Sequence, residues 1–163
     1  MSSDTPFHSW SKGTLSLARV FEEIVAYVRA EPERAYRIIV GSDSATRNPV
    51  SLVTAVTVWR VGNGAVHFWV VSEKKNFHTL RDRITEEALQ SIMLAQELRA
   101  GLGDRLGEDV LWDGQIQIHI DVGEQGPTRE IIDQVVGMVR GFGFEAVIKP
   151  DSFGASQVAD RHT

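Results

Sequence analysis

The most informative stretch of this sequence is residues 37–43, Arg37-Ile38-Ile39-Val40-Gly41-Ser42-Asp43. It is a short run, apolar on both faces and rich in β-branched side chains, and it ends on an acidic residue. Such runs are typical of a central strand that is buried on both sides. Aspartate is disfavoured inside strands, so Asp43 is expected where this strand ends.

A second stretch, residues 116–121, also ends on an aspartate. Three isoleucines there alternate with Gln117, His119 and Asp121, which predicts a strand with unlike faces. If the two strands lie side by side and parallel, Asp43 and Asp121 reach the same edge of the sheet, where ligands of α/β sheets gather. Each aspartate alone is also a common turn residue. Together they favour a shared site.

The remaining pattern predicts a single α/β domain over residues 1–163, with residues 1–11 flexible. In its first half we expect a helix from residue 17 that ends before Pro32, then strands over 51–61 and 65–72 joined by a Gly-Asn-Gly turn. A helix over 80–98 and a glycine-rich loop at residues 101, 103 and 107 follow. After the strand at 116–121 we expect a helix over 128–140, a strand over 145–149 and a short helical tail. This order predicts a mixed five-stranded sheet with helices on both faces.

The helix over residues 80–98 carries two adjacent glutamates with different expected environments. At about 100° per residue, Glu87 falls within the apolar arc that contains Ile84 and Ala88, whereas Glu86 falls on the opposite side. A glutamate on a buried stripe needs a cation or a hydrogen-bonding partner. The alternative is that Glu87 lies at the edge of the stripe and extends into water.

Composition narrows the possible chemistry. The chain of 163 residues contains no cysteine, so carboxylates and histidines are the side chains left to hold a metal. A formal net charge of −5 argues against strong non-specific nucleic-acid binding, although a local basic face is compatible with it. The one dense basic patch consists of Lys74, Lys75, Arg81 and Arg83. It is either a solvated face or a surface that contacts phosphate groups. Without a signal-peptide pattern or an apolar run of about 20 residues, we expect a soluble, cytoplasmic protein.

Five short motifs in this chain resemble those of the bacterial YkuK-like proteins, a ribonuclease H-like family. They are VGSDS (40–44), LRDRI (80–84), HIDVG (119–123), KPDS (149–152) and ADRHT (159–163). The resemblance covers nearly the whole chain from Phe21 onward. It implies a ribonuclease H-like sheet in the order 3-2-1-4-5, with the first helix as an additional element.

By analogy with ribonuclease H-like nucleases, the resemblance implies four acidic site residues: Asp43, Glu87, Asp121 and Asp160. The alternative for Asp160 is an exposed acid on a chain terminus, which is the commoner situation there. Four carboxylates suit Mg²⁺ or Mn²⁺ and two-metal hydrolysis of a phosphodiester bond. We therefore expect a metal-dependent nuclease whose nucleic acid contacts the basic patch and Lys149. The alternative is a catalytically inactive domain of the same fold that binds nucleic acid or a protein.

Overall fold

The computed structural model of the chain describes residues 4–107 and 116–152. Regular structure within these ranges consists of β1 (Phe7–Ser9), β2 (Gly13–Leu15), α1 (Leu17–Ala30), β3 (Tyr36–Ser44), β4 (Leu52–Arg60), β5 (Ala65–Val71), α2 (Leu80–Leu106), β6 (Ile116–His119), a short 3₁₀ helix (Arg129–Ile131), α3 (Ile132–Gly141) and β7 (Glu145–Val147). Within these ranges no helix combines the length and apolar character needed to cross a bilayer.

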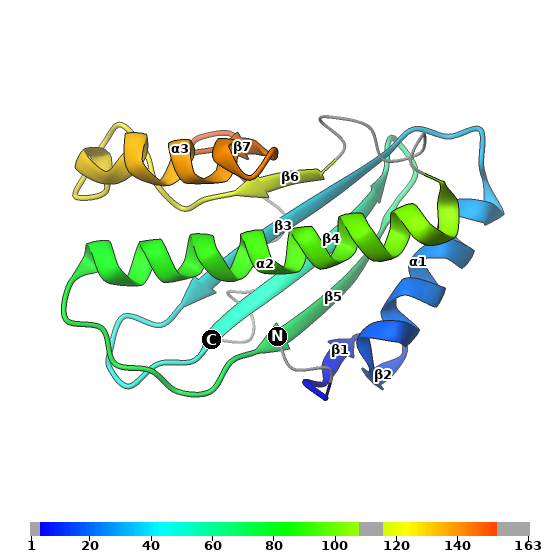
Figure 1. Cartoon of the computed structure of the whole chain (residues 1–163), viewed down its shortest axis with the longest axis horizontal. Helices are drawn as coiled ribbons and strands as arrows, with labels where there is room; N and C mark the ends of the chain where they lie inside the picture. Colours follow the sequence, from blue (N-terminus) through cyan, green and yellow to red (C-terminus); the bar gives the residue numbers. More distant parts are fainter. Residues whose placement is uncertain (1–3, 108–115, 153–163) are drawn as a thin grey trace.

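The strands form one mixed sheet in the order β2-β1-β5-β4-β3-β6-β7 (Figure 1). Strand β3 pairs in parallel with β6, and β6 pairs in parallel with β7, whereas the pairs on the other side of β3 are antiparallel. The expected order 3-2-1-4-5 is confirmed as β5-β4-β3-β6-β7. The expected count of five strands is wrong, because β1 and β2 extend the sheet beyond β5.

The two extra strands are short and lie where the sequence has no alternating pattern. Strand β1 falls within residues 1–11, for which we expected flexibility, and its Phe7 pairs with Val70 and is buried. A three-residue strand is too short to show a period of two in the sequence. Its position is fixed instead by pairing with a strand more than 60 residues away.

Helix α2 is longer than expected because glycines 101 and 103 lie inside it rather than in a loop. It begins at Leu80, as predicted, where the Thr79 hydroxyl accepts a hydrogen bond from the amide of Asp82 at 3.0 Å, and it continues to Leu106. A Cβ atom at Gly101 would lie 2.4 Å from Cζ of Phe21, a residue of α1. Gly101 therefore permits a close approach of α1 and α2, and it does not end the helix.

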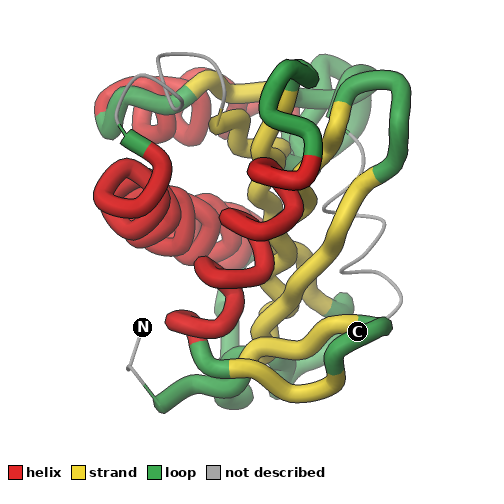
Figure 2. The backbone as a smooth tube through the Cα atoms, turned by 90° about the vertical axis from the view of Figure 1, so that its right-hand side faces the viewer, coloured by secondary structure: helices red, strands yellow, loops and turns green. Residues whose placement is uncertain are grey.

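The described helices lie on one side of the sheet (Figure 2). Residues of α1, α2 and α3 join the apolar side chains of β3, β4 and β6 in one continuous core. The expectation of helices on both faces is therefore not met within residues 4–107 and 116–152. On the opposite face, a smaller buried cluster consists of Ile39, Val53, Ala55 and Trp69.

Candidate functional site

Strands β3 and β6 bring the two predicted aspartates to neighbouring positions. The last paired residues of this parallel ladder are Val40 and Ile118, and Asp43 and Asp121 each follow three residues later. The two strands therefore end at the same edge of the sheet, as the sequence predicted. Asp43 remains within β3, with a carboxylate oxygen that accepts a hydrogen bond from the Ser44 amide at 2.8 Å.

Strand alternation separates the aspartates from the helix side of the sheet. Ser42 and Ser44 both contact α2, so Asp43 between them points to the opposite face. Likewise, Ile120 and Val122 join the core beneath the helices, which directs Asp121 away from it. The two aspartates thus approach the sheet edge from one face, and any acid on α2 approaches it from the other.

Glu87 is the acid that α2 contributes, and the predicted helix phase is confirmed. Glu87 is only 5% exposed, among apolar side chains that include Ile84 and Ala88. Its neighbour Glu86 is more exposed, bonds to the Lys75 ammonium group and accepts a hydrogen bond from Gln90 at 2.9 Å. The two glutamates therefore differ in the way that the helical period predicts.

The contacts of the Glu87 carboxylate are few for a buried acid. Ser44 Oγ donates a hydrogen bond to Glu87 Oε1 at 2.6 Å. The Arg83 Nε atom lies 4.0 Å from the same oxygen, which is an ion-pair distance but too long for a hydrogen bond. That Nε atom is itself buried without a hydrogen-bond acceptor among the described residues. Glu87 and Arg83 thus form a buried pair that is only partly satisfied.

These surroundings raise the pKa of Glu87 to about 8. Burial is the largest cause, because it penalises the charged carboxylate. The negative charges of Asp43 and Asp121 raise this pKa further, while the Ser44 hydrogen bond and the Arg83 charge lower it. At neutral pH, Glu87 therefore holds a proton, and its carboxyl group interacts electrostatically with both aspartates at the edge of the sheet.

A chain of hydroxyl groups next to Glu87 was not anticipated from the sequence. Ser42 Oγ lies 2.8 Å from Thr54 Oγ1 and 2.9 Å from Ser91 Oγ, and all three residues are buried. Ser91 Oγ also donates to the Glu87 carbonyl oxygen at 3.0 Å. One signal was present, since the position of Ser91 falls on the apolar arc of its helix.

Lys149 occupies the other side of the site, next to Asp121. Its Nζ lies 2.6 Å from Asp121 Oδ1. A Cβ atom at Gly123 would lie 3.1 Å from Lys149 Cβ, so the absence of a side chain there allows the lysine to pack closely. The HIDVG and KPDS motifs therefore meet in space, and a cationic group already lies against Asp121.

The comparisons with known proteins concern the family of the chain. The model of a family described as ribonuclease H-like matches residues 19–163. The chain belongs to the ribonuclease H-like family. Within it, the chain is 30% identical over 170 residues to a Bacillus subtilis (strain 168) protein called "Uncharacterized protein YkuK", with 96% of each sequence covered. The resemblance to YkuK-like proteins is thereby confirmed. No solved structure matches the chain.

In this ribonuclease H-like domain, several residues of the predicted basic patch have partners within the protein. The Arg81 guanidinium donates to the Gln134 side chain of α3, and Arg83 Nη1 donates to the Ala45 carbonyl oxygen at 3.4 Å. Lys75 pairs with Glu86, whereas Lys74 is exposed. The patch therefore consists partly of groups that connect α2 to its neighbours.

The donor chemistry of the candidate site suits a hard divalent cation, because it offers carboxylate oxygens. Within the described ranges, however, no three acidic or histidine side chains are close enough to hold one ion. Asp160, the fourth predicted ligand, lies outside the described residues. The Lys149 ammonium against Asp121 shows that a positive charge is accommodated at this edge.

Proposed function

We propose that this protein is a metal-dependent nuclease that hydrolyses phosphodiester bonds of nucleic acid. The proposal rests chiefly on one observation: Glu87 lies on the helix side of the sheet edge that carries Asp43 and Asp121, and burial, together with these two negative charges, raises its pKa to about 8. Strongly perturbed acids of this kind concentrate at functional sites. Membership of the ribonuclease H-like family supports the same activity.

The residues proposed to hold Mg²⁺ or Mn²⁺ are Asp43, Glu87, Asp121 and Asp160. A bound divalent cation would supply charge stabilisation for the phosphoryl group and lower the pKa of a coordinated water. Glu87 must lose its proton before it acts as a ligand, so we expect metal affinity to rise steeply as the pH approaches about 8. Ser44 fixes the orientation of the Glu87 carboxyl group through its 2.6 Å hydrogen bond.

Lys149 and the basic patch are proposed to contact the substrate. Lys149 is more than half exposed, so its ammonium group can leave Asp121 and bind a phosphate oxygen. Lys74 is exposed, and Lys75 is partly exposed beside α2. Arg83 is a weaker candidate for this role, because its side chain is mostly buried against Glu87.

The ion pair between Lys149 and Asp121 also favours a second candidate function. Lys149 neutralises Asp121, and the described acids of this region do not form a group of three that could hold a metal ion. Both observations suit a domain that binds nucleic acid or a protein without cleaving it. The two functions differ in their need for a metal. A nuclease requires a tight carboxylate site, whereas a binding domain does not.

The test is a cleavage assay on labelled RNA, DNA and RNA–DNA hybrids, in single-stranded and duplex form, with Mg²⁺, Mn²⁺ or a chelator. We expect cleavage by the wild type with a divalent ion and none by Glu87→Gln or Asp43→Asn. Glu86→Gln is the matched control, because it makes the same chemical change one residue away and should retain activity. Absence of metal-dependent cleavage, together with metal-independent binding of nucleic acid, would support the second function instead.

Asp160 requires a separate test because it lies outside the described residues. We propose that a chain truncated after Ser152 folds but binds Mn²⁺ more weakly and loses cleavage. Asp160→Asn within the full chain separates loss of the carboxylate from loss of the segment. Full activity of both variants would restrict the proposed site to Asp43, Glu87 and Asp121.

A further inference from the structure

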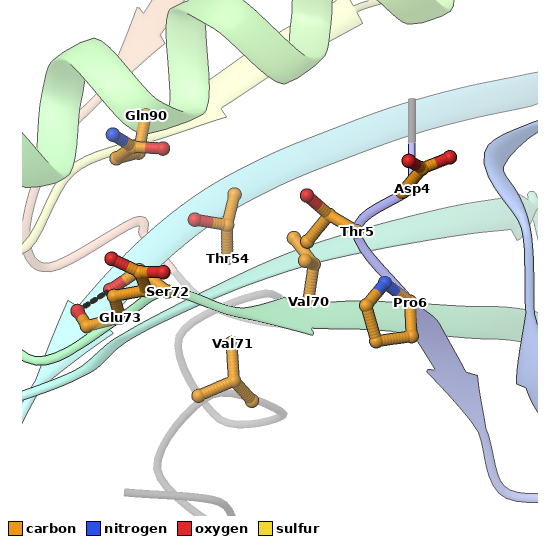
Figure 3. A pocket seen from close by; sticks show the side chains of 9 residues that line it. All are labelled: Asp4, Thr5, Pro6, Thr54, Val70, Val71, Ser72, Glu73 and Gln90. Atoms are coloured by element: carbon orange, nitrogen blue, oxygen red, sulfur yellow. Dashed lines mark hydrogen bonds between the residues drawn. The ribbon is translucent and has the colours of Figure 1, made fainter. Parts of the chain in front are cut away.

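A pocket of about 460 Å³ has Gln90 of α2 in its wall, three residues after Glu87 in the chain (Figure 3). Its walls come from α2, from β4, from the end of β5 and from residues 4–6. Small-molecule sites typically have volumes of about 300–1,000 Å³ and combine apolar walls with a few converging polar groups. The pocket has the size and the mixed lining of such a site.

The polar groups that line this pocket are rich in hydrogen-bond acceptors. Asp4 and Glu73 contribute carboxylates, and Thr5, Thr54 and Ser72 contribute hydroxyl groups. None of the described lining residues is basic. The pocket is therefore unsuited to a phosphate group and suited to a neutral ligand that presents N–H donors.

The rest of the lining fits a flat, partly apolar ring. Pro6 and Val70 provide apolar surface beside Thr54, and Gln90 of α2 provides an amide above it (Figure 3). Buried hydroxyl groups link the wall of the pocket to the candidate site. The hydroxyl group of Thr54, in the pocket wall, is hydrogen-bonded to the Ser42 hydroxyl. The Ser42 hydroxyl is in turn hydrogen-bonded to Ser91 of α2, one helical turn after Glu87.

We propose that this pocket binds a nucleobase that carries an exocyclic amino group. The base belongs to a nucleotide of the same strand whose phosphodiester bond lies at the carboxylate site. This proposal rests on the proposed nuclease function. Carboxylates accept hydrogen bonds from the amino groups of cytosine, adenine and guanine, whereas uracil presents two carbonyl oxygens around one N–H. Lys74 directly follows Glu73 and is exposed, so it can contact the phosphate next to the bound base.

The experiment is a calorimetric titration of cytidine, adenosine, guanosine and uridine into the full chain, in a buffer that contains a chelator. We expect the three nucleosides with amino groups to bind at least about fivefold more tightly than uridine. Glu73→Gln should reduce or reverse this preference, because a primary amide donates as well as accepts. Glu130→Gln, another exposed glutamate that does not line the pocket, is the matched control and should leave all four affinities unchanged.

A second arm separates a strand subsite from a site for free nucleosides. A short oligocytidylate should displace labelled cytidine at a lower concentration than cytidine itself, and Lys74→Ala should remove that advantage. Equal affinities for all four nucleosides, no binding at millimolar concentration, or unchanged selectivity in Glu73→Gln would overturn the proposal.

The chelator keeps this test independent of cleavage. Selective nucleoside binding by a protein that cleaves nothing with Mg²⁺ or Mn²⁺ would retain the pocket assignment and reject the nuclease. Metal-dependent cleavage without nucleoside selectivity would do the reverse.

Discussion

Strand β3 lies beside a buried ionisable side chain near each of its ends, and the two side chains have very different surroundings. Near its start, Arg60 of β4 faces Tyr36 and is almost fully paired. Its guanidinium donates to the Tyr36 hydroxyl at 3.0 Å, to Glu31 Oε1 at 3.2 Å and to the Tyr27 carbonyl oxygen at 2.8 Å. The same group lies 4.0 Å from the centre of the Tyr27 ring.

Near the end of β3, Glu87 is equally buried but has one hydrogen bond to a side chain, from Ser44, and an arginine at 4.0 Å. The charge of Arg60 is stabilised by its neighbours, whereas the charge of Glu87 is opposed by burial, Asp43 and Asp121. A buried charge with full pairing supports the fold. A buried charge that the protein leaves partly unsatisfied is available for binding and catalysis.

The largest effect is expected from removal of the paired charge. Arg60→Leu removes the guanidinium that donates to Glu31 Oε1, the Tyr36 hydroxyl and the Tyr27 carbonyl oxygen, so we expect a loss of about 5 kcal/mol and a melting temperature lower by about 10 °C or more. Arg34→Leu is a matched control, because Arg34 pairs with the same Glu31 at 2.9 Å but is about half exposed. It should change stability by less than about 1 kcal/mol. Equal melting temperatures for the two variants would contradict the structural role of Arg60.

The next effect is the pH dependence conferred by Glu87. Its pKa in the folded protein, about 8, lies above the unfolded value near 4.5, so the native state binds more protons between these values and loses stability as the pH rises through them. At about 1.36 kcal/mol per pKa unit, the loss amounts to roughly 4–5 kcal/mol by pH 8. We expect Glu87→Gln to unfold at higher denaturant concentration than the wild type at pH 8, and at nearly the same concentration at pH 4. Parallel pH curves for the two proteins in a chelator would show that Glu87 ionises normally.

A smaller effect should follow from removal of either aspartate. Asp43→Asn and Asp121→Asn each remove a negative charge that raises the Glu87 pKa, so we expect that pKa to fall and metal-free stability to rise by about 1 kcal/mol or less. Both variants should also lose the stabilisation that Mg²⁺ or Mn²⁺ confers on the wild type. A carbon-13 NMR titration of the Glu87 carboxyl group and thermal melts with and without metal measure the two effects. Retention of the full metal-induced shift would place the metal site elsewhere.

The smallest effect is expected at Glu86. The Lys75 hydrogen bond lowers the pKa of Glu86, so its contribution to stability is present above the unfolded pKa and is lost as the pH falls. Because this pair is partly exposed, Glu86→Gln should change stability by about 0.5 kcal/mol or less. A change as large as that of Glu87→Gln would remove the contrast between the two glutamates.

Periodicity was sufficient for the features that depend on local geometry. Alternation and apolar runs predicted β3 to β7, and the helical period separated Glu87 from Glu86. The order of these strands around β3 came instead from the resemblance to YkuK-like proteins. The strands and the helix phase follow from side-chain direction, which repeats every two residues in a strand and every 3.6 in a helix. A few residues of sequence therefore contain enough information to predict them.

Other features arise from contacts between distant parts of the chain, and only the tertiary structure decided them. Gly101 stays helical because Phe21 packs against it from another helix, and Phe7 becomes a strand residue because β5 offers an edge. The Ser44 hydroxyl reaches Glu87 across 43 positions of sequence, and Lys149 reaches Asp121 across the β6–β7 edge. The acids were visible in the sequence, but the groups that determine their charge are brought to them by packing, which no local pattern records.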